Sequence, residues 1–486
     1  MEGPITRAVR RLAGKRRVVA RPAPLLLELF QEVEGEEIER YRIPPFVYTI
    51  KRAGPAVNYE VTPDLSMTEV LRLRETVAEI SATLRPSALD PLTFSGLVDL
   101  LSQDAAGRLA AIGDPERVRV LSRLAAFEAV GIPTVYCLSL DGSVSEFYVD
   151  APGTPVYLDH SRHGRCETQL ALTERERKAV ETHMDTFKGY TIDYTNPSLK
   201  NEFDVFGNRL RVSLDLSPLA VNSFSLDVRK LTSSRLTIGD LVASDVVSAE
   251  AASFLLAALE VGMNVTIVGE TGTGKTTLLN ALDEAMSPRL RRIYVEDAVE
   301  TKDLLERGYH QMKLKVDPFD RGSDASRTKS AEITKILHRS PDVVVLGEIQ
   351  SEEHSRAFFH ALSAGVRGLQ TFHASSAALA VRRWNEMHGI SKTNLLDLDV
   401  LVQMARPERL GSKRQVFGIS VMAEGQGGEP TLCEVYARAR DARLQRVAAW
   451  DELQVRKPAT SREEILERLE RIQATIEDAA TARVSA

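Results

Sequence analysis

The chain contains few of the features that mark secreted, membrane-spanning or nucleic-acid-binding proteins. Its three cysteines, Cys137, Cys166 and Cys433, are far apart in sequence, which fits a reducing compartment better than a disulfide framework. There is no run of about 18 or more apolar residues, so we expect no transmembrane helix, and no apolar signal-peptide core follows the basic N-terminus. The formal net charge of -6 gives no support to a nucleic-acid footprint. We therefore expect a soluble globular protein whose length suggests about three domains.

One stretch carries a specific chemical signal. Residues 269–276 read Gly-Glu-Thr-Gly-Thr-Gly-Lys-Thr and match the P-loop pattern G-x-x-x-x-G-K-[ST]. The β-branched run 265–268 before it predicts a buried strand, and the leucines at 278, 279 and 282 predict one face of a following helix. The alternative is a match by chance, and the correct flanking strand and helix make a chance match rarer.

Strand, glycine-rich loop and helix in this order suit a phosphate ligand. Glycines let the backbone wrap a phosphate closely, and exposed N–H groups at the helix N-terminus supply positive potential. Lys275 would reach the β- and γ-phosphates, and the Thr276 hydroxyl would ligate Mg²⁺. The sequence predicts nucleotide contacts from Gly269, Glu270, Thr271, Gly272, Thr273, Gly274, Lys275, Thr276 and Thr277.

Composition and periodicity divide the chain into six predicted segments. These are a basic arm (1–24), an N-terminal α+β subdomain (25–132), a second α+β domain (133–231), a linker (232–240), the P-loop domain (241–455) and a C-terminal helix (456–486). Within the second domain, the run 135–140 predicts a strand. In the C-terminal segment, Ile465, Leu469, Ile472 and Ile476 predict an apolar helix face that docks on the body or on a neighbouring subunit.

The basic arm has two interpretations. It carries seven Lys and Arg residues against one acid, Glu2, and the bland interpretation is a disordered solvated tail. Because Ile5, Val9 and Leu12 fall at helical spacing, the sharper interpretation is a basic amphipathic helix that touches an anionic membrane surface. Gly14 argues against a long helix.

Three further groups are predicted at strand ends. Glu296 with Asp297, Glu348 and His373 each follow an apolar strand pattern, and ligands of doubly wound sheets bind at the carboxyl ends of the strands. Glu348 could orient or deprotonate the attacking water or hold Mg²⁺, and Glu296 could take the other of these two tasks. The structural alternatives are a helix cap for Glu348 and a satisfied structural histidine for His373, which could otherwise sense the γ-phosphate or contact a neighbouring subunit.

At this point the chain resembles a known superfamily, the secretion and type IV pilus ATPases (PilT/GspE/FlaI-like enzymes), and its texture is closest to the archaeal branch. The resemblance rests on four motifs in order: residues 269–276 (Walker A), 293–297 with Glu300 (acidic "Asp box"), 339–348 (Walker B with Gly-Glu) and 368–374 (His box). The segment from about 135 to 235 is similar to the family's nucleotide-facing N-terminal domain. Residues 25–130 match less distinctly.

The resemblance implies an α/β fold: a RecA-like P-loop ATPase core with a mostly parallel sheet, preceded by α+β N-terminal domains. It implies ATP and Mg²⁺ as cofactors, with Thr276, Glu296 and Glu348 near the metal directly or through water. It also implies that Arg209, Arg211 or Arg229 completes the site from the N-terminal side, while leaving open whether Arg209 or Arg211 is the matching residue.

The implied activity is ATP hydrolysis by a ring, expected to be a hexamer, in the cytoplasm at the inner face of the membrane. Hydrolysis would power a pilus-like filament or protein secretion through an integral membrane platform protein. The alternatives are a nucleic-acid translocase on the same core, which the acidic balance disfavours, and an ATP-binding regulator without turnover. Two departures from the family pattern stand out: Gln350 replaces an arginine and Val366 replaces a histidine.

Overall fold

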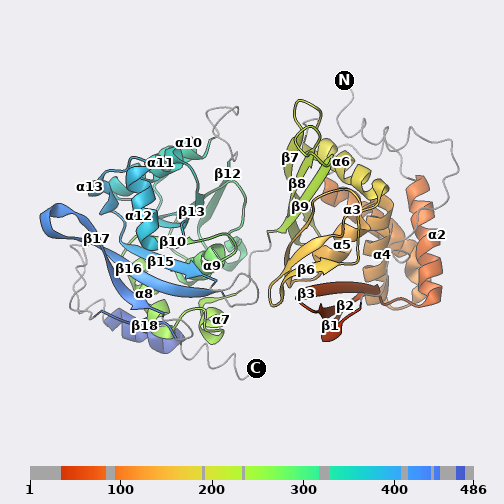
Figure 1. Cartoon of the computed structure of the whole chain (residues 1–486), viewed down its shortest axis with the longest axis horizontal. Helices are drawn as coiled ribbons and strands as arrows, with labels where there is room; N and C mark the ends of the chain where they lie inside the picture. Colours follow the sequence, from red (N-terminus) through yellow and green to blue (C-terminus); the bar gives the residue numbers. More distant parts are fainter. Residues whose placement is uncertain are drawn as a thin grey trace. The chain divides into compact units, whose positions relative to one another are not determined.

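The computed structural model describes residues 34–83, 93–188, 192–231, 236–316, 328–406, 414–438, 443–448 and 467–476. The predicted basic arm, residues 1–24, lies outside these ranges. The chain divides into two compact units, Met1–Thr232 and Ser233–Ala486. We call them the N-terminal unit and the P-loop unit and describe each by itself (Figure 1).

The N-terminal unit is built on one nine-stranded sheet in the order β1-β2-β3-β6-β5-β4-β9-β8-β7. Its strands are β1 Glu36–Ile43, β2 Phe46–Ala53, β3 Ala56–Pro63, β4 Val144–Val149, β5 Tyr157–His160, β6 Gly164–Thr168, β7 Ser198–Val205, β8 Asn208–Leu216 and β9 Phe224–Lys230. Its helices are α2 Met67–Thr83, α3 Phe94–Leu109, α4 Pro115–Val130, α5 Pro133–Leu140 and α6 Glu174–Lys188. Strands from both sides of the predicted boundary at residues 132 and 133 therefore share one sheet and one hydrophobic core.

The predicted strand over 135–140 is wrong, because these residues form helix α5. Residues 133–139 are all buried, and an apolar run without a polar face has no periodicity that separates a strand from a buried helix. Two local signals favour the helix. Gly131 ends α4 in a left-handed conformation, and Pro133 occupies the first turn of α5, where its missing N–H costs nothing.

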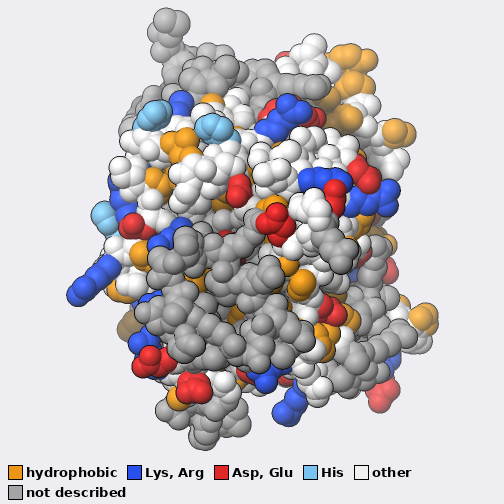
Figure 2. Space-filling model, turned by 90° about the vertical axis from the view of Figure 1, so that its left-hand side faces the viewer, with side chains coloured by type: hydrophobic (Ala, Val, Ile, Leu, Met, Phe, Trp, Pro, Cys, Tyr) orange, Lys and Arg blue, Asp and Glu red, His pale blue; other side chains and the backbone are white. Residues whose placement is uncertain are grey.

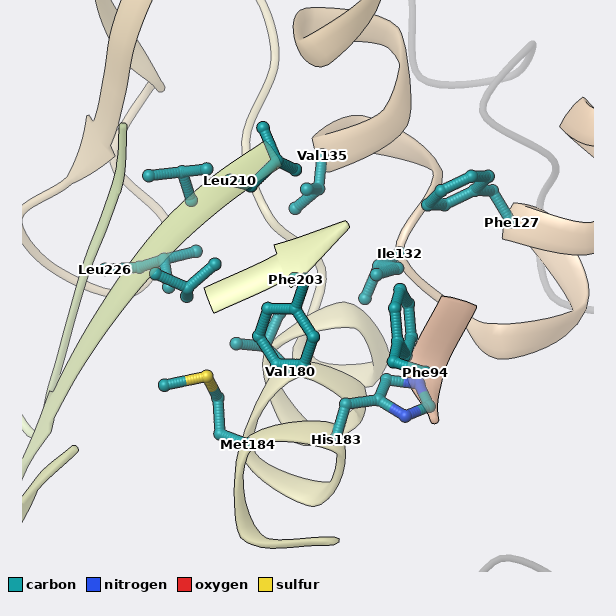
Figure 3. Close-up of a pocket in the computed structure, with 12 residues that line it drawn as sticks. Phe94, Phe127, Ile132, Val135, Val180, His183, Met184, Phe203, Leu210 and Leu226 are labelled. Carbon is teal, nitrogen blue, oxygen red and sulfur yellow. The ribbon is translucent and has the colours of Figure 1, made fainter. Parts of the chain in front are cut away.

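A small apolar cavity lies within the N-terminal unit (Figure 3). Its volume is about 40 Å³, and its lining comes from helices α3 to α6 and strands β7 to β9. Phe94 and His183 meet edge to face at its rim, with ring centroids 5.1 Å apart. His183 Nε2 is 2.9 Å from the carbonyl oxygen of Val130, so that ring nitrogen is satisfied within the fold.

The P-loop unit is built on a second nine-stranded sheet, in the order β12-β11-β13-β14-β10-β15-β16-β17-β18. Its strands are β10 Val265–Gly269, β11 Arg292–Glu296, β12 Gln311–Lys315, β13 Val343–Ile349, β14 Arg367–His373, β15 Val400–Ala405, β16 Gln415–Glu424, β17 Pro430–Ala437 and β18 Gln445–Arg446. Its helices are α7 Ile238–Ala243, α8 Ala249–Glu260, α9 Lys275–Ala285, α10 Lys329–Lys335, α11 Glu352–Ser363, α12 Ala377–Glu386 and α13 Lys392–Leu395. The strands from β12 to β15 run parallel, and β16 to β18 extend the sheet in antiparallel fashion.

Helices cover both faces of this parallel sheet. One core packs α8 and α9 on one face, and the other packs α10 to α13 on the opposite face. The central strand β13 is buried on both faces, which explains why its residues 343–346 are an unbroken apolar run. The predicted RecA-like α/β core, preceded by an α+β N-terminal region, is confirmed.

The described part of the C-terminal helix, residues 467–476, packs on the body of the P-loop unit. Leu469 and Ile476 from the predicted apolar face are 6% and 4% exposed and belong to the core on the α8 face. Arg471 on the polar side lies 3.4 Å from Glu260 at the end of α8. Of the two predicted docking partners, the helix therefore uses its own unit.

Among the residues that the structure describes, none of the helices has the length and apolar character needed to cross a bilayer.

Candidate active site

The P-loop connects β10 to α9 along the predicted path. Gly272 and Gly274 adopt positive φ angles of 77° and 93°, a region that favours glycine. Gly269 is required for a different reason, because a Cβ there would lie 2.5 Å from Thr273 Oγ1 and 2.7 Å from the Met404 carbonyl oxygen. The glycines therefore determine the course of the loop. Glu270, Thr271 and Gly272 are exposed on it, and Thr276 and Thr277 are half-buried in the first turn of α9.

Lys275 turns back onto the loop that carries it. Its Nζ lies 3.0 Å from the carbonyl oxygen of Gly269 and 2.9 Å from that of Glu270. It also lies 3.2 Å from Nδ1 of His373. An ammonium group only donates hydrogen bonds, so His373 Nδ1 accepts and the proton of the neutral ring is on Nε2.

His373 joins Lys275 to Glu348. Its Nε2 donates to Glu348 Oε1, and Gln350 Nε2 donates to the other carboxylate oxygen at 2.7 Å. Burial raises the pKa of Glu348, but the hydrogen bonds from His373 and Gln350 and the positive charge beside it, including that of Lys275, outweigh burial and hold the pKa well below 4.5. Glu348 is therefore an ionised carboxylate with both oxygens engaged.

The strand order explains why these groups meet. β14 lies between β13 and β10, and His373 at its end is in register with Gly269 at the end of β10. Glu348 lies near the end of β13, on the other side of β14. The P-loop, Glu348 and His373 therefore lie at the same edge of the sheet, as the sequence predicts.

Glu296 has a different environment. It is 1% exposed, and its carboxylate accepts hydrogen bonds from the backbone N–H groups of Glu300 and Thr301 and from the Thr301 hydroxyl, at 3.0, 3.1 and 2.6 Å. Burial raises its pKa, although these hydrogen bonds partly oppose the rise. The carboxylate of Glu296 thus holds the loop that follows β11.

That loop presents another acid to the P-loop helix. Glu300 Oε2 accepts a hydrogen bond from the Thr276 hydroxyl at 3.1 Å, and Asn280 Nδ2 donates to the Glu300 carbonyl oxygen at 3.0 Å. Sequence reasoning placed Glu300 in the acidic box but did not select it as a site residue. The only signal for it was its position four residues after Glu296 in an acidic cluster.

The oxygen atoms beside the P-loop suit a magnesium ion. Mg²⁺ prefers hydroxyl, carboxylate and phosphate oxygens, and Thr276 with Glu300 supplies a hydroxyl and a carboxylate side by side. Glu348 adds an ionised carboxylate two strands from the P-loop strand. Glu296 fits the metal less well, because both of its oxygens already accept hydrogen bonds from the acidic loop.

The three predicted arginines lie in the N-terminal unit. Arg209 and Arg211 are two residues apart on β8 and share a face of the sheet. Arg211 stands directly opposite Arg229 on β9. Oε1 of Glu202 lies 3.8 Å from Nη2 of Arg211. Like charges directly opposite one another are destabilising, but Glu202 beside Arg211 and Glu146 opposite Arg229 offset the positive charge of this cluster. Its part in the nucleotide site stays a prediction.

Comparison with known proteins shows the family. The family model described as "Type II/IV secretion system protein" matches residues 201–447, about half of the 486 residues. An uncharacterized protein of Methanocaldococcus jannaschii is 32% identical over 218 residues, which are 44% of this chain and 38% of that protein. The conjugal transfer protein TrbB of Rhizobium radiobacter is 24% identical over 315 residues, which are 63% of this chain and 92% of that protein.

Among solved structures, the ATPase DotB of Yersinia pseudotuberculosis is similar with a TM-score of 0.41 and 13% identity. The match covers 69% of this chain and 82% of that one. The alignments with the first three curated relatives span 38%, 30% and 61% of their lengths. With the family model matching half of its length, this chain belongs to the type II/IV secretion system protein family.

Proposed function

We propose that this chain is an ATP hydrolase that powers protein secretion or the assembly of a type IV pilus-like filament. The observation that carries the proposal is the contact series from Lys275 through His373 to Glu348 across three neighbouring strand ends. It joins the group that would hold the phosphates to the carboxylate that would act on water.

Nucleotide binding would exchange the partners of Lys275. Its ammonium now donates to two P-loop carbonyls and to His373, and the β- and γ-phosphate oxygens would take over some of these bonds. The N–H groups at the start of α9 would add positive potential. When bound at Thr276 with Glu300, Mg²⁺ would neutralise charge on the phosphates.

Glu348 is the better of the two candidates for positioning water. It is ionised at neutral pH, and it lies at the same edge as the P-loop, where a water attacking the γ-phosphate would be. Glu296 instead orders the loop that carries Glu300. In this proposal, movement of Lys275 to the phosphates removes its hydrogen bond to His373 and thereby changes the contact between His373 and Glu348.

The higher-order part of the proposal follows the family. The chain would form a ring, expected to be hexameric, in which Arg209, Arg211 or Arg229 completes a nucleotide site. The ring would act in the cytoplasm, at the inner face of the membrane, on an integral membrane platform protein. Only ligand contacts that differ between two conformations can perform such work, and the γ-phosphate contacts of Lys275 and His373 are of this kind.

The test is release of inorganic phosphate from MgATP by the purified full-length protein, with Lys275→Ala as the control. We expect turnover by the parent protein and loss of nucleotide binding in the variant, because the charge facing the phosphates is removed. ATP binding without turnover by the parent would support the regulator alternative instead, which the hydrogen bond from Gln350 to Glu348 Oε2 keeps open.

Addition of DNA to the same assay addresses the translocase alternative, which the name of the conjugal transfer relative suggests. On the face drawn in Figure 2, lysine and arginine side chains stand beside aspartate and glutamate side chains among the described residues. Mixed charge of this kind gives little support to a nucleic-acid track. Hydrolysis that rises strongly with DNA would favour the translocase.

A further inference from the structure

The backbone next to Glu348 departs from regular parallel pairing. Leu346 pairs with Gln370, and the next pair is Ile349 with Phe372. Gly347 and Glu348 on β13 therefore face the single residue Thr371 on β14. Two residues opposite one form a β-bulge, a feature that is rare in parallel pairs and that re-aims side chains beside active sites.

Two side chains bind the carbonyl groups of this bulge. The Thr371 hydroxyl donates to the carbonyl oxygen of Gly347. Lys329 Nζ donates to the carbonyl oxygen of Glu348 at 2.5 Å. Gly347 and Glu348 are half-buried, and carbonyl groups shielded from water require partners, which hydroxyl and ammonium groups supply at this point.

Lys329 is placed at the bulge at an energetic cost. It is the first residue of α10, and its side chain is 1% exposed. A buried charge is costly unless it is paired and hydrogen-bonded, and Lys329 is paired with Asp297 at 3.1 Å. The lysine thus ties the acidic loop after β11 to the strand end that carries Glu348.

We propose that Lys329 and Thr371 are positioning residues that hold the β13 bulge and thereby aim the Glu348 carboxylate at His373 and the nucleotide. The inference rests on the proposed ATP hydrolysis and adds two residues to its machinery. It also bears on Gln350, the neutral side chain two residues after Glu348. Gln350 donates a hydrogen bond to Glu348 Oε2 but carries no charge. The cation that contacts the bulge is Lys329, which is buried.

The experiment is a double-mutant cycle between Lys329→Met and Glu348→Gln, measured as single-turnover phosphate release, with KM for MgATP measured in parallel. A misplaced reacting group costs about 10- to 100-fold in rate, so we expect Lys329→Met to lower kcat by that factor and to change KM less than about threefold. In the Glu348→Gln background the same change should have little further effect, because the two residues act as a unit. Equal losses in both backgrounds, or an equal loss of nucleotide affinity, would overturn the proposal.

Two controls accompany the cycle. Lys335→Met changes a lysine on the same helix, one whose partner is Glu332 on that helix, and should leave kcat unchanged. Thr371→Val removes the second bulge contact while keeping the shape of the side chain, and it should lower kcat in the same direction. If Lys329→Met does not fold, the cycle is run with Thr371→Val and the same outcomes decide.

Hydrogen exchange separates this inference from the proposed function. In the nucleotide-free protein, peptides covering 343–350 should exchange faster in Lys329→Met than in the parent and in Lys335→Met, because the bulge has lost a tether. Unchanged exchange would overturn the inference even if the parent hydrolyses ATP. A parent protein that releases no phosphate would instead overturn the proposed function, and the exchange result would still stand on its own.

Discussion

Gly347 has no side chain at the point where the carboxylate of Glu296 lies. A Cβ at Gly347 would be 3.3 Å from both Cγ and Oε1 of Glu296. A larger side chain at position 347 would therefore press on the buried carboxylate that the neighbouring strand β11 places there.

Gly347→Ala should destabilise the P-loop unit by about 1 to 3 kcal/mol, the usual cost of overpacking. Glu296 cannot yield easily, since three hydrogen bonds hold its carboxylate. Gly347→Asp should cost more, because a second carboxylate would be buried beside the first. Thermal unfolding of the two variants measures the effect. Gly107→Ala is the matched control, because a Cβ there meets nothing within 4 Å, and a melting temperature of Gly347→Ala at or above that of the parent would contradict the explanation.

Glu348→Gln should keep MgATP binding and slow hydrolysis by about 10²- to 10⁴-fold, the usual contribution of a positioned acid or base. The amide can still accept a hydrogen bond from His373, so the fold around it should persist. Nucleotide affinity and phosphate release are measured on the same preparation. Hydrolysis within a few-fold of the parent, with loss in Glu296→Gln, would assign the role to Glu296.

At least one of Arg209→Ala, Arg211→Ala and Arg229→Ala should lower hydrolysis strongly while MgATP still binds. Arginine presents a planar charged fork to phosphate oxygens, and an arginine supplied from outside the core contributes about 10³ to 10⁵ in rate. Arg165→Ala is the control, because this arginine lies on β6 of the same sheet and pairs with Asp159. Near-normal rates in all three variants would remove the arginines from the site.

Mixing the inactive arginine variant with Glu348→Gln protein distinguishes two arrangements. If the arginine acts across a subunit boundary, mixed rings contain some interfaces with both parental halves, and part of the activity should return. Absence of rescue despite demonstrated subunit exchange would indicate action within one chain.

Stability of the N-terminal unit should depend on Glu69 at acid pH. Ser66 and Glu69 form a capping box at the start of α2: the Ser66 N–H donates to Glu69 Oε2 at 2.7 Å and the Glu69 N–H donates to Ser66 Oγ, while Arg117 Nε lies 2.5 Å from Glu69 Oε1. The Arg117 hydrogen bond, partly opposed by burial and aided by Ser66, lowers the pKa of Glu69 from 4.5 to about 2. The ionised form is favoured in the folded state, so its stabilisation is complete above pH 4.5 and is lost as the pH falls toward 2.

Glu69→Gln should therefore lower the melting temperature at pH 6 and have a smaller effect near pH 3. We expect about 1 kcal/mol at neutral pH, since the pair is partly screened by solvent. Glu75→Gln, an exposed change on the same helix, serves as the control and should show no such trend. An effect of Glu69→Gln that is equal at both pH values would indicate that the charge of Glu69 does not stabilise the helix.

The sequence alone determined the features that depend on neighbouring residues. The P-loop course follows from the positive φ of Gly272 and Gly274, and the Ser66–Glu69 cap is a contact within one turn. The unbroken apolar run of β13 also indicated a central strand, because burial on both faces leaves no alternation. These signals are local, so they are legible without knowledge of the fold.

Only the tertiary structure decided which distant groups meet. Lys275 and His373 are 98 residues apart, and they touch because β14 pairs with β10, an order of strands that no local pattern encodes. On its other side β14 pairs with β13, and that pairing contains the bulge that Lys329 and Thr371 hold. Sequence left Glu296 and Glu348 equivalent, whereas packing turned the oxygens of Glu296 toward its own loop and left Glu348 at the edge. The sequence did not predict helix α5 at residues 133–140 for a related reason. Its residues 133–139 are all buried in the tertiary structure, so the helix has no polar face and no helical periodicity in its sequence.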